Sequence, residues 1–129
     1  MISSNTLSIG NYVIFNGHTV KVKGLQTDEL LVEFSDGTLL PVTYITVRPV
    51  DTLSHVLVSA GLKLQSSEEI LSHTKEVYSI DILGKKYLIT GLLLKDSTIW
   101  KFDNFISFHY FHQLQNICRL VNENFELVL

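Results

Sequence analysis

The segment 109–121 holds the densest set of side chains that could bind a ligand. On a helix, His112, Gln115, Asn116 and Arg119 stand at i, i+3, i+4 and i+7 and share one face. Imidazole, amide and guanidinium groups can hydrogen-bond the amide, phosphate or base edge of a nucleotide-like ligand. The same groups can instead hold unpaired backbone atoms of a neighbouring strand or loop. The second use is the commoner one, because most side-chain hydrogen bonds go to backbone or water.

Catalytic and metal-binding patterns find little support. His109 and His112 stand at i, i+3 and would need a third metal ligand from elsewhere, and the sequence has no His-Glu-x-x-His motif. Cys118 falls on the apolar face of the predicted helix, where a thiol acts as a small hydrophobic group. Neither a Gly-x-Ser-x-Gly motif nor a glycine-rich phosphate loop is present. We therefore expect no enzyme, no metal and no other cofactor, with a hydrolase as the least favoured function.

Composition and charge exclude several classes of protein. The chain has 129 residues, with 10 Lys and Arg against 13 Asp and Glu, and 46% of its residues are hydrophobic. This apolar content excludes disorder, and the mildly acidic balance disfavours general nucleic-acid binding. The single cysteine excludes an internal disulfide, the first residues do not resemble a signal peptide, and no apolar run is long enough to span a membrane. We expect a soluble, cytoplasmic protein that makes no membrane contact.

The first part of the chain has the pattern of short β-strands joined by tight turns. Asn16-Gly17 predicts a type I′ hairpin, because both central positions of that turn need positive φ. Gly24 predicts a bulge, and Pro41 predicts an edge strand. Strands are expected over 11–15, 18–23, 30–34, 39–42 and 44–47. Together they predict an SH3-like small β-barrel over residues 1–50.

Residues 51–129 are expected to form a helix, a β-meander and a C-terminal helix packed on the barrel. Helical spacing of apolar residues predicts a helix over 53–60, and the polar segment 65–76 is predicted as a loop. Further strands are expected over 77–83, 87–94, 98–102 and 105–108, before a helix over 109–121. The predicted fold class is α+β, with mainly antiparallel β-structure.

An aromatic run predicts a protein interface. Trp100, Phe102, Phe108 and Tyr110 belong to a series of aromatic residues that alternates between two faces, so they cannot all enter one core. Exposed aromatic side chains are typical of binding surfaces. The apolar segment 87–94 is typical of a strand buried on both faces, and one helix covers only one of them. These patterns predict an interface on the C-terminal sheet and a homo-oligomer.

Two motifs resemble those of a family of short bacterial and prophage proteins. IGNYV at 9–13 resembles the family's opening, and HQLQN at 112–116 resembles its C-terminal helix. Phe111 stands where the family commonly has valine, and the segment 122–127 lacks the glycine of the family's usual tail. The first motif is also similar to a strand start in SH3-like barrels. The resemblance implies a bacterial or phage origin and no particular activity.

The leading hypothesis is a non-catalytic binding or interaction protein of phage or mobile-element type that modulates a host protein. Its contacts would bury Trp100, Phe102 and neighbouring apolar groups. The alternative is a protein that sequesters a small nucleotide-like ligand in a pocket lined by the polar face of the C-terminal helix. The two hypotheses differ in whether that face lines a cavity or holds backbone atoms.

Overall fold

The computed structural model describes residues 6–129, which form two compact units. Unit 1 contains the described residues up to Asp51 together with Tyr110–Asn116, and unit 2 contains Thr52–His109 with Ile117–Leu129. The predicted division into 1–50 and 51–129 grouped the whole C-terminal helix with the second part, whereas the first half of that helix belongs to unit 1. The predicted fold class is confirmed. The described chain is α+β, with mainly antiparallel strands in two sheets and two α-helices.

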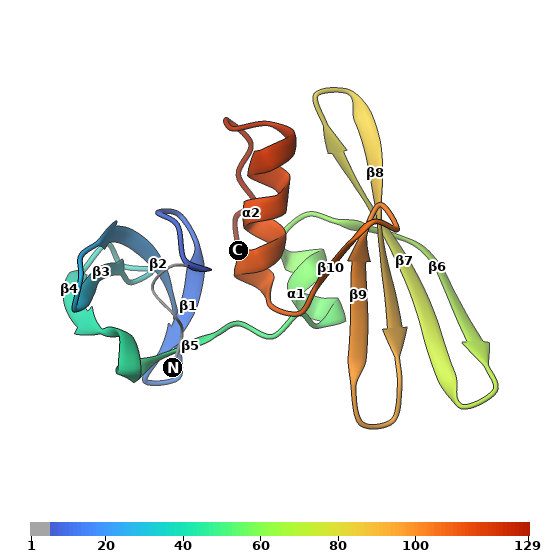
Figure 1. The fold of residues 1–129 in the computed structure, drawn as a ribbon, viewed down its shortest axis with the longest axis horizontal. Coiled ribbons are helices and arrows are strands. Elements are labelled where there is room, and N and C mark those ends of the chain that lie inside the picture. Colours follow the sequence, from blue (N-terminus) through green and yellow to red (C-terminus); the bar gives the residue numbers. More distant parts are fainter. Residues whose placement is uncertain (1–5) are drawn as a thin grey trace. The chain divides into compact units, whose positions relative to one another are not determined.

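Unit 1 is built on a five-stranded antiparallel sheet with strand order β4-β3-β2-β1-β5 (Figure 1). Its elements are β1 (Tyr12–Phe15), β2 (His18–Leu25), β3 (Glu29–Glu33), β4 (Leu39–Thr43), the 3-10 turn η2 (Tyr44–Thr46) and β5 (Val47–Pro49). Side chains alternate between the faces of a strand, so every second residue enters the core. These core residues include Val13, Val20, Val22, Leu30, Val32, Val42 and Val47.

Turn residues set the register of this sheet as the sequence predicts. Asn16 and Gly17 have φ of 48° and 78° and join β1 to β2 in a hairpin. The pairing of β2 with β3 shifts between Val22 and Gly24, which confirms the predicted bulge. Pro41 lies on β4, an edge strand, also as predicted. The extended segment predicted after Pro41 is interrupted by η2, which turns the chain before β5.

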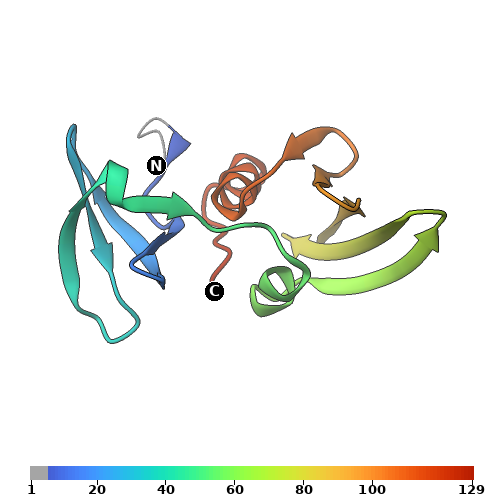
Figure 2. The ribbon, with the colours of Figure 1, turned by 90° about the horizontal axis from the view of Figure 1, so that it is seen from below.

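Unit 2 contains a second five-stranded antiparallel sheet, with strand order β10-β9-β8-β7-β6 (Figure 2). Its strands are β6 (Lys63–Ile70), β7 (His73–Ile82), β8 (Lys85–Leu93), β9 (Thr98–Phe102) and β10 (Ile106–Phe108). Helix α1 (Ser54–Ser59) precedes the sheet, and α2 (Phe111–Val121) follows it. Register places Tyr78, Ile89 and Phe102 in one row across the buried face of the sheet.

A glycine makes room for the largest side chain of this sheet. Gly91 and Trp100 are directly opposite each other on β8 and β9. A Cβ atom on Gly91 would lie 2.7 Å from the Cε3 and Cη2 atoms of Trp100. The indole Nε1–H donates to the carbonyl oxygen of Thr52 at 3.1 Å, which fixes the ring from its other end. Trp100 is therefore a core residue whose position depends on the missing side chain opposite it.

Two predictions for this part of the chain are wrong, namely the loop over 65–76 and the burial of the strand over 87–94 on both faces. Residues 65–76 were predicted as a loop, but they form most of β6 and the start of β7. All eight residues of β6 are exposed, so this strand lacks the alternation that reveals a half-buried strand. The segment 87–94 is not buried on both faces, because only Ile89 and Gly91 in it are fully buried.

Candidate functional site

The polar face of α2 begins with Gln115, whose amide completes the edge of a strand in unit 1. Strand β5 ends at Pro49, which pairs with Val13 on β1. Beyond that pair, no strand among the described residues pairs with this edge of β1. There the backbone N–H of Tyr12 donates to Oε1 of Gln115 at 3.0 Å, and Nε2 of Gln115 donates to the carbonyl oxygen of Gly10 at 3.1 Å. The amide thus takes the place of a peptide group of a further strand, with one donor and one acceptor.

Asn116 extends the same network toward the start of the described chain. The Nδ2 of Asn11 donates to Oδ1 of Asn116 at 3.0 Å, and Nδ2 of Asn116 donates to the carbonyl oxygen of Thr6 at 3.1 Å. Asn11 is fully buried, and its Oδ1 accepts the backbone N–H of Ser8 at 2.7 Å. The two motifs that carry the family resemblance are therefore two sides of one hydrogen-bond network.

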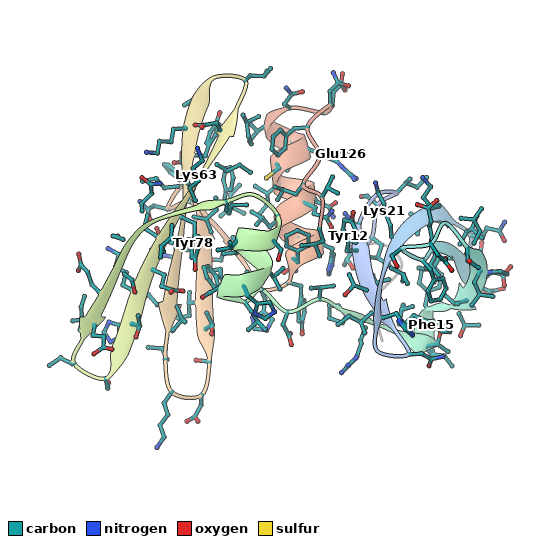
Figure 3. The ribbon with its side chains drawn as sticks, turned by 180° about the vertical axis from the view of Figure 1, so that it is seen from behind. Tyr12, Phe15, Lys21, Lys63, Tyr78 and Glu126 are labelled. Atoms are coloured by element: carbon teal, nitrogen blue, oxygen red, sulfur yellow. The ribbon has the colours of Figure 1, made fainter. Side chains whose placement is uncertain are left out.

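Contacts of the Tyr12 ring and a cap at the start of α2 accompany this network. The ring of Phe111, in the first turn of α2, lies 6.4 Å from the ring of Tyr12. Lys21 Nζ lies 6.0 Å from the centroid of the Tyr12 ring, and both residues are labelled in Figure 3. The backbone N–H of Tyr110 donates to Oε1 of Gln113 at 2.9 Å, which caps the start of the helix. The first half of α2 is thus held to β1 by an apolar contact and by amide hydrogen bonds.

His112, another residue of the predicted stripe, takes no part in these hydrogen bonds. It is only 2% exposed, and neither ring nitrogen has a hydrogen-bond partner among the described residues. Its ring stacks on Tyr110 with centroids 6.0 Å apart and an angle of 11° between the planes. Burial lowers the pKa of His112, because the charged imidazolium loses its hydration. A buried imidazole without a hydrogen-bond partner is unusual, because most buried polar side-chain atoms are hydrogen-bonded.

Arg119 belongs to the half of α2 that lies in unit 2. Its side chain is half-buried. The structure therefore brings Gln115 and Asn116 together with backbone atoms near the start of unit 1, and does not join all four stripe residues in one polar cluster. Asn11, which completes the network, is absent from the sequence-based candidates. The sequence feature that could have identified Asn11 is its position as a polar residue within the otherwise apolar start of a strand.

The predicted interface aromatics are mostly core residues of unit 2. Trp100, Phe102 and Phe108 are all buried. Trp100 stacks on Phe108 at 6.4 Å between centroids, and Phe102 stacks on Tyr87 at 5.4 Å. Tyr110 is half-buried and stacks on His112 in unit 1. The first three side chains are covered in this structure, so a partner would have to contact other groups.

The described residues provide no support for a nucleophilic cysteine or for a metal site. Burial raises the pKa of the Cys118 thiol to about 12, so the thiol stays protonated at neutral pH. Across residues 6–129 no group of three or more His, Cys, Asp and Glu side chains is arranged to hold a metal ion.

Unit 1 has a hollow, lined mainly by apolar residues, that the sequence did not predict. The hollow has a volume of about 230 Å³ and is lined in part by Leu25, Glu29, Leu31 and Pro41. Gly24, Leu31 and Pro41 are cross-strand neighbours on β2, β3 and β4. Because Gly24 has no side chain, it leaves the surface open above Leu31, whose Cβ would lie 3.4 Å from a Cβ on the glycine. The lining is mainly apolar, and the exposed Glu29 is its one acidic residue.

No protein-family model, no curated protein and no solved structure matches this chain. No helix in the described part of the chain is long and apolar enough to cross a membrane.

Proposed function

We propose that this chain is a non-catalytic interaction protein that binds a protein partner through the hollow of unit 1. The observation that carries the proposal is the open apolar surface around Gly24, Leu31 and Pro41, with the acidic residue Glu29 in its lining. Hydrophobic burial in a small concave site provides affinity, and a charge at the rim provides selectivity. Two of the polar groups that first suggested chemistry, Gln115 and Asn116, are instead bonded inside unit 1.

The partner that fits this surface is an extended segment with an apolar side chain next to a lysine or arginine. Asp28 and Glu29 are both exposed beside the hollow and favour a basic flank. Pro41 on the edge strand β4 lacks an N–H, so side-chain contacts rather than strand addition would dominate binding. Given the resemblance to bacterial and prophage proteins, a bacterial host protein is the class of partner proposed.

Short peptides provide the test. Hexapeptides with a central leucine flanked by lysines are compared with the same peptides flanked by glutamates, and backbone amide shifts are followed by NMR. We expect saturable shifts at Gly24 and Leu31 with the lysine peptides alone. Glu29→Lys should abolish them, whereas Glu123→Lys, an exposed charge change in unit 2, should not. Shifts that are absent or indifferent to peptide charge would contradict the proposal.

A second candidate function is the sequestering of a small nucleotide-like ligand, and the unpaired ring nitrogens of buried His112 favour it. Gln115 and Asn116 are already bonded to backbone, so His112 would have to bind the ligand without their help. A thermal-shift screen with mononucleotides and cyclic nucleotides tests this function. It predicts stabilisation of the native chain that His112→Phe removes.

We also propose that the protein works as a homo-oligomer. The long exposed strand β6 at the edge of the sheet of unit 2 supports self-association, because edge strands offer unpaired backbone groups to another strand. Sedimentation equilibrium measures this directly, and a monomer at high protein concentration would contradict it.

A further inference from the structure

Among the described sheet edges, β6 is the one that is both long and unblocked. The edge strands are β4 and β5 in one sheet and β6 and β10 in the other. Strand β4 contains Pro41, while β5 and β10 have three residues each, and β5 ends at Pro49. Strand β6 has eight exposed residues with neither proline nor glycine. Such an edge offers its outer backbone groups to a further strand. The Lys63 carbonyl oxygen accepts a long hydrogen bond of 3.4 Å from Nε2 of Gln65.

The charges along β6 are arranged so that the strand complements itself when it is antiparallel. Lys63 is its first residue and is labelled on the outer strand in Figure 3, while Glu68 and Glu69 stand near its end. Antiparallel pairing of two copies brings the basic start of each strand to the acidic end of the other, twice by symmetry. Parallel pairing in register would place like charges side by side, which is unfavourable.

The bulge in β6 restricts the register of such a pairing. The pairing with β7 shifts between Leu64 and Ser66, so Gln65 is the extra residue. As a result Lys63, Ser66 and Glu68 share one face of the sheet, and Ser67 lies on the other. In a two-fold antiparallel pairing, residues opposite each other must lie on the same face of the joined sheet. With Gln65 left out as the bulge residue, a register centred on Ser67 meets this condition and pairs all other residues of β6. It leaves each Lys63 diagonal to Glu68 of the second copy, within reach of long side chains.

We propose that β6 pairs antiparallel with β6 of a second copy of this chain, centred on Ser67, so that the two five-stranded sheets join into one. The proposal rests on the self-association proposed above and names the surface that makes it. The two Ser67 side chains face each other at the centre, where their small size lets the backbones approach and their hydroxyls can hydrogen-bond. Two Lys63–Glu68 attractions, one on each side of the centre, select the antiparallel orientation.

Charge reversal tests the surface by sedimentation equilibrium. The native chain is expected to be a dimer, and Lys63→Glu and Glu68→Lys each replace two attractions by two repulsions. Each variant should weaken dimerisation by about tenfold or more. An equimolar mixture of the two variants should recover the dimer, because the acidic strand of one meets the basic strand of the other. The control Glu123→Lys should leave dimerisation unchanged.

The outcomes separate this inference from the proposed function. A monomeric native chain would overturn both the self-association and the β6 surface, and would leave a foreign strand as the remaining occupant of this edge. A dimer that resists both reversals would overturn the β6 surface alone and leave self-association standing. If both single variants lose the dimer and their equimolar mixture does not recover it, the proposed pairing is also overturned.

Cysteine cross-linking tests the register. Ser67→Cys should form a disulfide-linked dimer with copper-phenanthroline as oxidant, because the two positions are opposite each other. Lys63→Cys should not, because the two Lys63 positions lie roughly 20 Å apart along the paired strands. The native Cys118 is buried and gives a low background. Efficient linking through Lys63→Cys, or none through Ser67→Cys, would overturn the register centred on Ser67.

Discussion

Replacing Gln115 by methionine should destabilise unit 1 by about 3 kcal/mol. Methionine has a similar length and shape and loses only the amide, so the packing of α2 is nearly preserved. The change removes the hydrogen bonds of 3.0 and 3.1 Å that the amide makes with the Tyr12 N–H and the Gly10 carbonyl oxygen. Both bonds are buried, and an unsatisfied buried backbone group costs about 1–3 kcal/mol. In a domain of this size, the total corresponds to a Tm lowered by roughly 10 °C.

Urea unfolding measures the free energy, and amide hydrogen exchange of Tyr12 gives a local measure within unit 1. Exchange of this N–H should accelerate strongly in Gln115→Met. The matched control is Gln113→Met on the same helix, whose side chain accepts the part-buried N–H of Tyr110, so its cost should stay near 1 kcal/mol. If Gln115→Met costs no more than Gln113→Met and leaves exchange of Tyr12 unchanged, the amide does not hold the strand edge.

Three further predictions follow from buried groups. Burial lowers the pKa of His112, so the unfolded chain binds a proton first as the pH falls below about 6.5, and the free energy of unfolding should decline there. His112→Phe should flatten this decline in urea titrations at pH 5 and 7.5. Gly91→Ala should cost about 2 kcal/mol because its Cβ meets the Trp100 ring, and it should shift the emission of this single tryptophan. Cys118, with its pKa raised by burial to about 12, should react with a thiol reagent only after addition of denaturant.

Local sequence signals predicted the parts of the fold that depend on local chemistry. The Asn16-Gly17 hairpin, the bulge at Gly24 and the edge position of Pro41 each follow from what one residue's backbone allows. Strand β6 escaped prediction because its neighbour in the sheet, rather than its own pattern, makes it a strand. A strand exposed on both faces carries no apolar period.

The candidate site was harder to predict because it depends on a long-range match. Gln115 and Gly10 are 105 positions apart, and the bond between them uses a backbone carbonyl that any residue would provide. The sequence revealed a polar helix face but not its use, since a ligand and a strand edge accept the same donors. Only the structure shows that β5 ends at Pro49 and that, in the described part of the chain, no strand continues along this edge of β1.

A number of large apolar residues lie exposed on the surface. Leu39, Leu71, Leu83, Phe105 and Leu120 are all well exposed, while the aromatic run at Trp100 fills the core. Scattered exposed apolar side chains are ordinary, so they do not define a function. Function must depend on places where such groups meet a second feature, as at the hollow of unit 1 with the acidic residue Glu29 in its lining or the charge-asymmetric edge of unit 2.

These two surfaces belong to different units, so their effects should be separable. Glu29→Lys should abolish peptide binding and leave dimerisation intact, because it changes no group on β6. Lys63→Glu should weaken the dimer and leave the peptide-induced shifts at Gly24 unchanged. If either variant affects both properties, the hollow and the strand edge are energetically coupled, and one assembled surface rather than two independent ones would carry the interaction.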